Sequence, residues 1–190
     1  MLKKQVHSAS RKSFYPPPFG EKALYVLGSA FHRAEDVLEK VKQSGLYLTN
    51  MPEEIYFNRD FDQTLLKIWA DEIVEAINKH NKVIVSVIHT PGKEQGIAER
   101  IRKNTGSMIK MVIKQIRLNE LIIEGGSTTS CILDQLKIRK LIPVQEIDTG
   151  VIRMKNEERP ELFLTTKPGS YSWADAVWFL HNKKKVKPFK

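Results

Sequence analysis

The sequence predicts an α/β protein with a mostly parallel central sheet, helices on both faces and a short antiparallel β extension near the carboxyl terminus. Continuous apolar runs of strand length alternate with longer segments in which apolar residues recur every three or four positions. Strands separated by helices favour parallel pairing, with the helices covering both faces of the sheet. The last strand-like segments follow one another without an intervening helix, which predicts the antiparallel extension.

Each element follows from its local pattern. Apolar runs predict buried strands at 23–27, 46–48, 82–88 and 121–123. Helical spacing predicts helices at 30–44, 62–80 and 94–118, one that ends near Leu136, and one at 172–180. Shorter strands are expected at 141–147, 150–154 and 162–166. Gly45 suits a helix C-cap, and Gly106 is a point at which the third helix can break or bend.

Length and composition set the class of protein. The 190 residues suit one domain with tails, at roughly 150 residues per domain, and 41% apolar content allows a core that folds alone. A single cysteine, Cys131, excludes an internal disulfide framework and a cysteine-based zinc cluster, and it fits a reducing, cytoplasmic compartment. No apolar run of about 20 residues suggests a membrane segment, and the first 20 residues lack the apolar stretch of a signal peptide.

The positive charge lies at the two ends of the chain. Lys and Arg total 31 against 22 Asp and Glu, a net charge of +9. Residues 1–20 read as a basic, proline-rich lead-in, 21–181 as the folded domain and 182–190 as a lysine-rich tail. The two ends hold nine basic and no acidic residues, so the folded middle is formally neutral. Such ends can attract nucleic acid weakly, but no recognition motif accompanies them, so nucleic-acid binding ranks lowest.

The strongest local motif is the turn that follows the strand at 121–123. Gly125 and Gly126 let the backbone approach a ligand, and the helix that follows aims free N–H groups and its positive dipole end at the same place. Ser127 and Thr128 add hydroxyl groups for capping or for phosphate oxygens. The alternative interpretation, an ordinary capped turn, weighs about equally on this stretch alone.

Three further loops are candidates for the same site. Gly28-Ser29 also follows a buried strand, and ligands of open parallel sheets bind beyond the carboxyl ends of strands. In the loop 167–172, Lys167 can place a point charge on a phosphate, next to Gly169. The loop around Gly150 reads as a simple turn. The sequence contains neither GxxxxGK[ST] nor GxGxxG, which argues against a P-loop NTPase and a standard dinucleotide-binding fold, and it contains no metal-spaced histidine pair.

The order and spacing of these loops resemble the carboxyl-terminal, nucleotide-binding domain of the four-carbon acid sugar kinases, formerly a domain of unknown function. The resemblance covers about residues 24–178 and rests on the whole set of loops: Gly28-Ser29, Gly125-Gly126-Ser127-Thr128, Thr149-Gly150-Val151 and Lys167-Pro168-Gly169-Ser170-Tyr171-Ser172. It implies a site for ATP with Mg²⁺, formed by Ser29, Gly125, Gly126, Ser127, Thr128, Gly150, Lys167 and Gly169. Ser127, Thr149 and Ser172 depart from the acidic residue, the proline and the glycine of the family pattern.

The resemblance also implies that a part is missing. Kinases of this family hold the sugar acid and the catalytic machinery in an amino-terminal domain, which residues 1–20 are too few to supply. Phosphoryl transfer needs donor and acceptor positioned together, so a partner chain, a missing domain or a homo-oligomer would have to complete the enzyme. The sequence identifies no catalytic residue. The alternative is an inert module that senses nucleotide or binds a partner.

Overall fold

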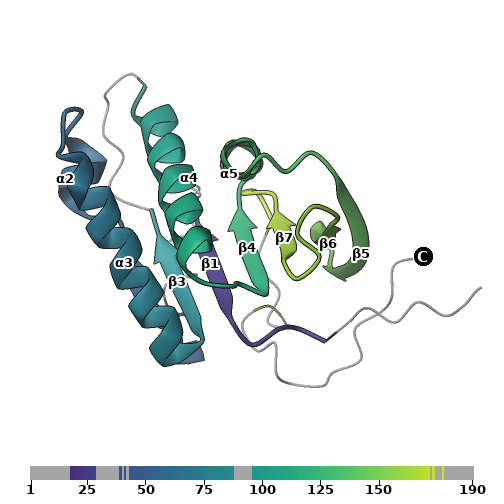
Figure 1. Cartoon of the computed structure of the whole chain (residues 1–190). Coiled ribbons are helices and arrows are strands. Elements are labelled where there is room, and N and C mark those ends of the chain that lie inside the picture. Colours follow the sequence, from purple (N-terminus) through teal and green to yellow (C-terminus); the bar gives the residue numbers. More distant parts are fainter. Residues whose placement is uncertain are drawn as a thin grey trace, which may run out of the picture.

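The computed structural model describes residues 18–28, 39, 41, 43–87, 96–171, 173 and 177. Seven strands form one mixed sheet in the order β2-β3-β1-β4-β7-β6-β5 (Figure 1). The strands are β1 (Ala23–Leu27), β2 (Tyr47–Asn50), β3 (Lys82–Ser86), β4 (Glu120–Glu124), β5 (Leu141–Asp148), β6 (Val151–Asn156) and β7 (Phe163–Lys167). The first five strands in this spatial order pair in parallel, and β6 pairs antiparallel with both β7 and β5. The predicted fold class is confirmed.

Four helices have described bounds: α2 (Glu53–Phe57), α3 (Gln63–His80), α4 (Ile97–Gln115) and α5 (Gly126–Leu136). The Asp62 carboxylate accepts a hydrogen bond from the Thr64 N–H at 2.9 Å and so caps α3. The sequence did not predict α2, because five residues are too few to show a helical period. Most of the predicted helices at 30–44 and 172–180 lies outside the described residues, of which Val41 and Val177 are helical.

Gly106 does not interrupt α4, which runs through it as one helix. The glycine is buried where α5 crosses, and a Cβ at this position would lie 2.9 Å from the Gln135 Cγ atom. A glycine here therefore permits the close approach of two helices. Its role is a packing contact, and not the break or bend that its position in the sequence suggested.

The two faces of the sheet differ in chemistry. α3, α4 and α5 lie over one face (Figure 1), where Leu24 and Val26 of β1 join the main apolar core. The alternate residues of β1, Ala23, Tyr25 and Leu27, point to the second face, because successive side chains of a strand alternate. The second face also contains buried charged side chains: Lys82, Glu120, Glu124, Arg153 and Lys167.

Glu120 and Arg153 form a fully buried ion pair on this second face. The Arg153 Nη2 atom lies 2.5 Å from Glu120 Oε1, the Nε atom lies 3.1 Å from Oε2, and both side chains are 0% exposed. The guanidinium is enclosed by the rings of Phe19 and Phe163, at 4.3 and 4.1 Å from their centroids. The Gly20 N–H donates to the same carboxylate at 3.0 Å. The pair therefore fastens residues 18–20 and strand β6 to the start of β4.

We expect the Arg153→Met variant to lose about 3–5 kcal/mol of unfolding free energy at pH 7, because it leaves a buried carboxylate without its cation. Burial raises the pKa of Glu120, and the hydrogen bonds and charge of Arg153 act in the opposite direction. Without Arg153, the pKa of Glu120 in the folded protein rises further above its value in the unfolded chain. A carboxyl group of this kind contributes most stability at low pH and loses it as pH rises through the folded pKa.

The deficit of Arg153→Met relative to the parent should therefore shrink between pH 7 and pH 5, as measured by urea unfolding. Arg139→Met, which removes an exposed arginine, is the matched control and should change stability little. Equal stability of Arg153→Met and the parent at pH 7 would contradict the assignment of a buried ion pair between Glu120 and Arg153.

Candidate functional site

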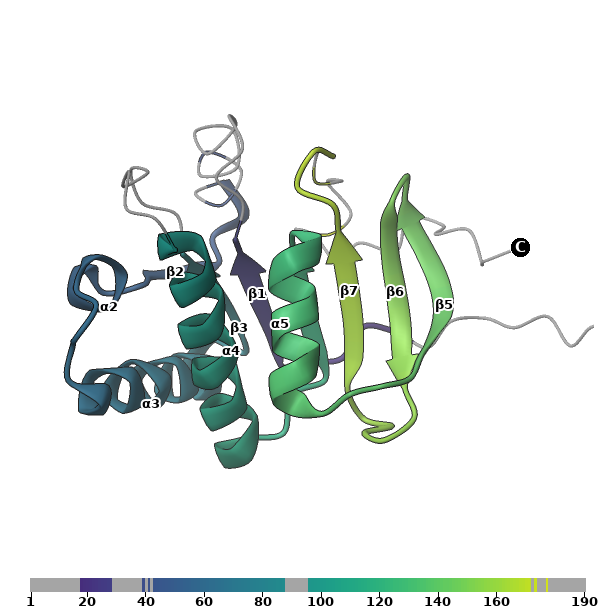
Figure 2. The same cartoon turned by 90° about the horizontal axis from the view of Figure 1, so that it is seen from above.

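The predicted loops meet at one edge of the sheet. β1, β4 and β7 are parallel neighbours, so their carboxyl ends lie together. β5 runs antiparallel to β6, which runs antiparallel to β7, and so the β5–β6 turn reaches the same edge. Figure 2 shows the ends of β1 and β7 and this turn along the upper edge of the sheet, beside the start of α5. We call this the carboxyl edge.

The turn between β4 and α5 requires its first glycine. Gly125 has φ +95° and precedes α5 as its N-cap residue, a conformation that residues with a Cβ rarely adopt. Its N–H donates to the Lys167 carbonyl at 2.8 Å, which ties the turn to the end of β7. On the other side, a Cβ at Gly28 would lie 2.9 Å from the Thr128 hydroxyl oxygen and 3.1 Å from the Glu124 carbonyl oxygen. The Gly28 and Gly125 loops are therefore in close contact.

The first turn of α5 contains backbone donors that have no acceptor in the described part of the chain. The N–H groups of Gly126, Ser127 and Thr128 have no acceptor among the described residues, and no side chain caps the helix. Gly126 and Ser127 are exposed, and a Cβ at Gly126 would meet no atom within 4 Å. The Thr128 side chain, at 5% exposure, is packed against Gly28 instead. Three N–H groups without a described acceptor, next to the open position at Gly126, suit a phosphate group.

Lys167 lies beneath this edge in a buried ion pair. Its Nζ atom is 2.8 Å from Glu124 Oε1, and the two side chains are 1% and 6% exposed. The same ammonium group donates to the carbonyl oxygens of Pro168, at 3.0 Å, and Tyr171, and it lies 5.1 Å from the centre of the Trp173 ring. Its three N–H donors thus all have protein acceptors. To bind a phosphate oxygen, Lys167 would have to give up one of these three protein acceptors.

The loop after β7 folds back onto the β5–β6 turn. The Tyr171 N–H donates to the Pro168 carbonyl at 3.2 Å, closing a turn that contains Gly169. Gly150 has φ +71°, and a Cβ there would lie 3.3 Å from two carbons of the Tyr171 ring. Tyr171 remains 47% exposed. The end of β7 and the loop after it therefore contact the turn before α5, through the Gly125 N–H, and the β5–β6 turn, through the Tyr171 ring.

The structure thus places seven of the eight predicted site residues on one edge: Gly125, Gly126, Ser127, Thr128, Gly150, Lys167 and Gly169. Ser29, the eighth, and Ser172 lie outside the described residues, as do the basic ends at 1–17 and 178–190. Sequence reasoning missed the role of Glu124. A glutamate at the end of the buried strand Glu120–Glu124 signals a buried partner, but the pattern does not tell which cation that is.

Other chemistry is limited among the described residues. They contain no group of three or more His, Cys, Asp and Glu side chains that could hold a metal ion. Burial raises the pKa of the Cys131 thiol, which disfavours the reactive thiolate. No helix in the described part of the chain has the length and apolar content to cross a membrane.

A family model described as a nucleotide-binding C-terminal domain matches residues 24–171. The chain therefore belongs to this family of nucleotide-binding C-terminal domains. The match includes Gly28, the Gly125–Thr128 turn, Gly150 and the Lys167 loop. No curated protein matches the sequence.

Solved structures share the fold. A Bordetella bronchiseptica protein of the DUF1537 family, crystallised with citrate as a domain-swapped dimer, has a TM-score of 0.65 at 16% identity over 83% of this chain and 39% of its own. A Haemophilus influenzae DUF1537 protein gives 0.65 at 16% identity over 89% and 42%. A Salmonella typhimurium protein, provisionally called a tRNA synthase, gives 0.68 at 12% identity over 87% and 41%. This chain spans about two fifths of the length of each of these proteins.

We expect the Lys167→Met variant to lose about 3–5 kcal/mol of unfolding free energy, because Glu124 would remain buried without its cation. The double variant Glu124→Gln/Lys167→Met should recover much of the loss, as measured by urea unfolding of all three proteins. Lys140→Met, which removes a cation from an exposed ion pair with Glu157, is the control and should change stability little. A Lys167→Met variant as stable as the parent would show that the pair does not hold the loop.

Proposed function

We propose that this chain binds ATP or ADP at the carboxyl edge, as the donor-binding part of a sugar-acid kinase. The observation that carries the proposal is the set of N–H groups at Gly126, Ser127 and Thr128, which have no acceptor among the residues that the structure describes, beside the open position at Gly126. A helix N-terminus of this kind favours phosphate through its N–H groups and its dipole. Membership in a family of nucleotide-binding domains supports a nucleotide as the source of that phosphate.

The remaining predicted residues would shape the site around the nucleotide. Gly28 and Gly125 keep the backbone close and free of side chains, with Ser29 following in the sequence. Gly150 and Gly169 belong to the two loops that meet at Tyr171, on the far side of the α5 terminus. Lys167 would hold the loop after β7 in place, and it would reach a phosphate oxygen only by exchanging one of its present acceptors. We propose that Mg²⁺ accompanies the nucleotide, since this ion is held largely by phosphates and water in such sites.

The acceptor would be bound by a separate unit. The chain spans about two fifths of the DUF1537 proteins that share its fold, which supports a second part that holds the acid. The Bordetella protein holds citrate, a carboxylic acid, and it is a domain-swapped dimer. We propose that a partner chain, a further domain or a second copy brings a sugar acid to the donor phosphate. Positioning the two substrates is the main contribution that a protein makes to phosphoryl transfer.

Thermal-shift and calorimetric titrations with ATP and ADP, with and without Mg²⁺, test nucleotide binding. A ligand at about one hundred times its Kd should add roughly 2.7 kcal/mol of stability. Gly126→Val should fold normally, because the position is open, yet weaken nucleotide binding about tenfold or more by blocking the backbone donors.

Gly126→Ala is the matched control for that variant. Its single methyl group fits the open position and should leave most of the affinity. Absence of any stabilisation of the parent by millimolar ATP or ADP would refute the proposal, and full affinity in Gly126→Val would place the nucleotide elsewhere.

A second candidate function is a nucleotide-binding module without catalysis. It is favoured by Ser127, which stands where the kinase motif has an acidic residue. ATP turnover with candidate sugar acids should be absent for the chain alone and appear when an acid-binding domain of a DUF1537 protein is added. Tight nucleotide binding without turnover in every such mixture would favour the inert module.

A further inference from the structure

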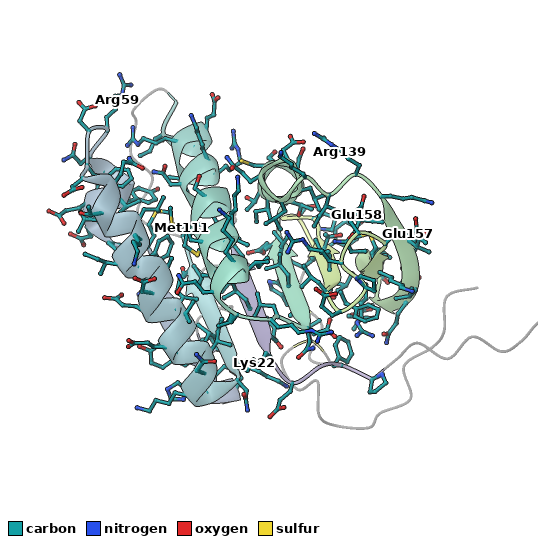
Figure 3. The ribbon with its side chains drawn as sticks, in the orientation of Figure 1. Lys22, Arg59, Met111, Arg139, Glu157 and Glu158 are labelled. Atoms are coloured by element: carbon teal, nitrogen blue, oxygen red, sulfur yellow. The ribbon has the colours of Figure 1, made fainter. Side chains whose placement is uncertain are left out.

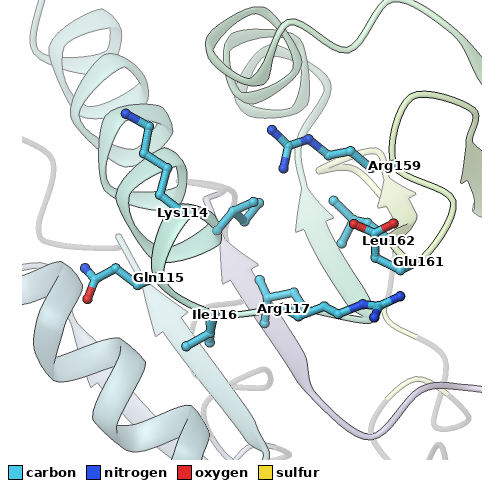
Figure 4. Close-up of a pocket in the computed structure, with 9 residues that line it drawn as sticks. Lys114, Gln115, Ile116, Arg117, Arg159, Glu161 and Leu162 are labelled. Carbon is cyan, nitrogen blue, oxygen red and sulfur yellow. The ribbon is translucent and has the colours of Figure 1, made fainter.

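A cavity lies at the opposite edge of the sheet from the proposed nucleotide site. It has a volume of about 280 Å³ and is lined by the end of α4, the connection from α4 to β4, and the connection from β6 to β7 (Figure 4). Leu118 and Leu162 line it just before the first residues of β4 and β7, so it belongs to the amino-terminal edge. Nothing in the proposed nucleotide site uses this cavity.

The walls of the cavity are fixed by the fold. Leu118 and Leu162 are 3% and 2% exposed and belong to the main apolar core. The Leu162 N–H donates to the Arg159 carbonyl at 2.9 Å, and the Phe163 N–H donates to the Asn119 carbonyl at 2.8 Å. These hydrogen bonds hold the two connections beside each other. The cavity therefore exists before any ligand binds, and its apolar residues are anchored in the core.

Positive charge predominates in the cavity. Lys114, Arg117 and Arg159 line it with a single carboxylate, Glu161. In Figure 4 the Arg117 side chain extends toward Glu161, but no ion pair joins them, and none of the three cations has an acceptor among the described residues. The two arginines come from different connections, so they can approach one ligand from two sides.

The neighbouring acidic groups are already engaged. Glu157 pairs with Lys140 at 2.7 Å, and the Glu158 carboxylate accepts the Arg139 N–H at 3.4 Å. Figure 3 shows Arg139, Glu157 and Glu158 close together on the side of the molecule near β5. Unlike Arg139, which also pairs with Asp134 at 2.9 Å, Arg117 and Arg159 have no carboxylate partner in the part of the chain that the structure describes. Their ten N–H donors are available to a ligand.

We propose that this cavity binds a small organic anion, with a carboxylate or phosphate group at Arg117 and Arg159 and a short apolar body against the half-buried lining residues Ile113 and Ile116. The planar guanidinium group pairs with both kinds of anion in two-pronged geometry. The volume falls just below the range of about 300–1,000 Å³ that drug-sized ligands occupy, which favours a compact molecule. The positive charge of Lys114 adds a long-range electrostatic attraction for the anion.

Titration of the ¹⁵N-labelled full chain at constant ionic strength tests the proposal. Butyrate and monobutyl phosphate share an apolar body and distinguish carboxylate from phosphate, and butyramide is the neutral control. At least one anion should shift the amide resonances near Leu118 and Leu162 in a saturable manner, and butyramide should not. Arg117→Gln and Arg159→Gln should each weaken binding about tenfold, the cost of losing one charge-assisted hydrogen bond.

Arg139→Gln makes the same change of charge on an arginine that does not line the cavity and should leave binding unchanged. All variants should keep the parent's thermal midpoint. Gly126→Val, which is designed to damage the nucleotide site, should bind the anion normally, so failure of one site is distinguishable from failure of the other. The proposal is overturned by the absence of saturable shifts, by equal weakening in Arg139→Gln, or by shifts confined to Gly125–Thr128.

Discussion

The structure depends on two acidic residues at the ends of one face of β4. Glu120 and Glu124 are two full side-chain repeats apart, so both point to the same face of the sheet. Each finds its cation on the carboxyl-terminal strands, Glu120 with Arg153 of β6 and Glu124 with Lys167 of β7. Because a buried charge without a partner is costly, these strands cannot slip along β4 without a large penalty. The two ion pairs therefore set the register between the parallel and antiparallel parts of the sheet.

The same constraint forms the carboxyl edge. Lys167 holds Glu124, the carbonyl groups of Pro168 and Tyr171, and the Trp173 ring in one cluster. The Gly125 N–H is bound by the Lys167 carbonyl group, so the turn before α5 and the loop after β7 move as one unit. This connection would hold the N–H groups at the start of α5 in place, which would lower the entropic cost of the phosphate binding that we propose. The excess of basic residues lies at the two ends of the chain, outside the described residues.

The sequence predicted much of the fold because the core is so apolar. The strand Ala23–Leu27 and the centre of β4, Leu121–Ile123, are buried on both faces and read as continuous apolar runs, and α3 has its capping residue and its apolar stripe. Gly106 was misjudged, since its effect depends on the nearby passage of α5 and not on its neighbours in the chain. α2 escaped notice because one and a half turns carry no measurable period. The site loops were recognised as a set, but only strand order could place Gly150 beside Tyr171.

By itself, the sequence determined the fold class, the glycine turns and the segregation of positive charge to the ends, because each is a local property of composition or spacing. Tertiary structure alone decided which charges meet. Lys167 looked like a free cation for phosphate, and it is a buried partner of Glu124, which lies 43 positions away in the chain. The cavity at Arg117 and Arg159 was likewise invisible, since it unites two connections that the sequence keeps apart. Long-range pairing is fixed by burial and strand order, and a linear pattern records neither.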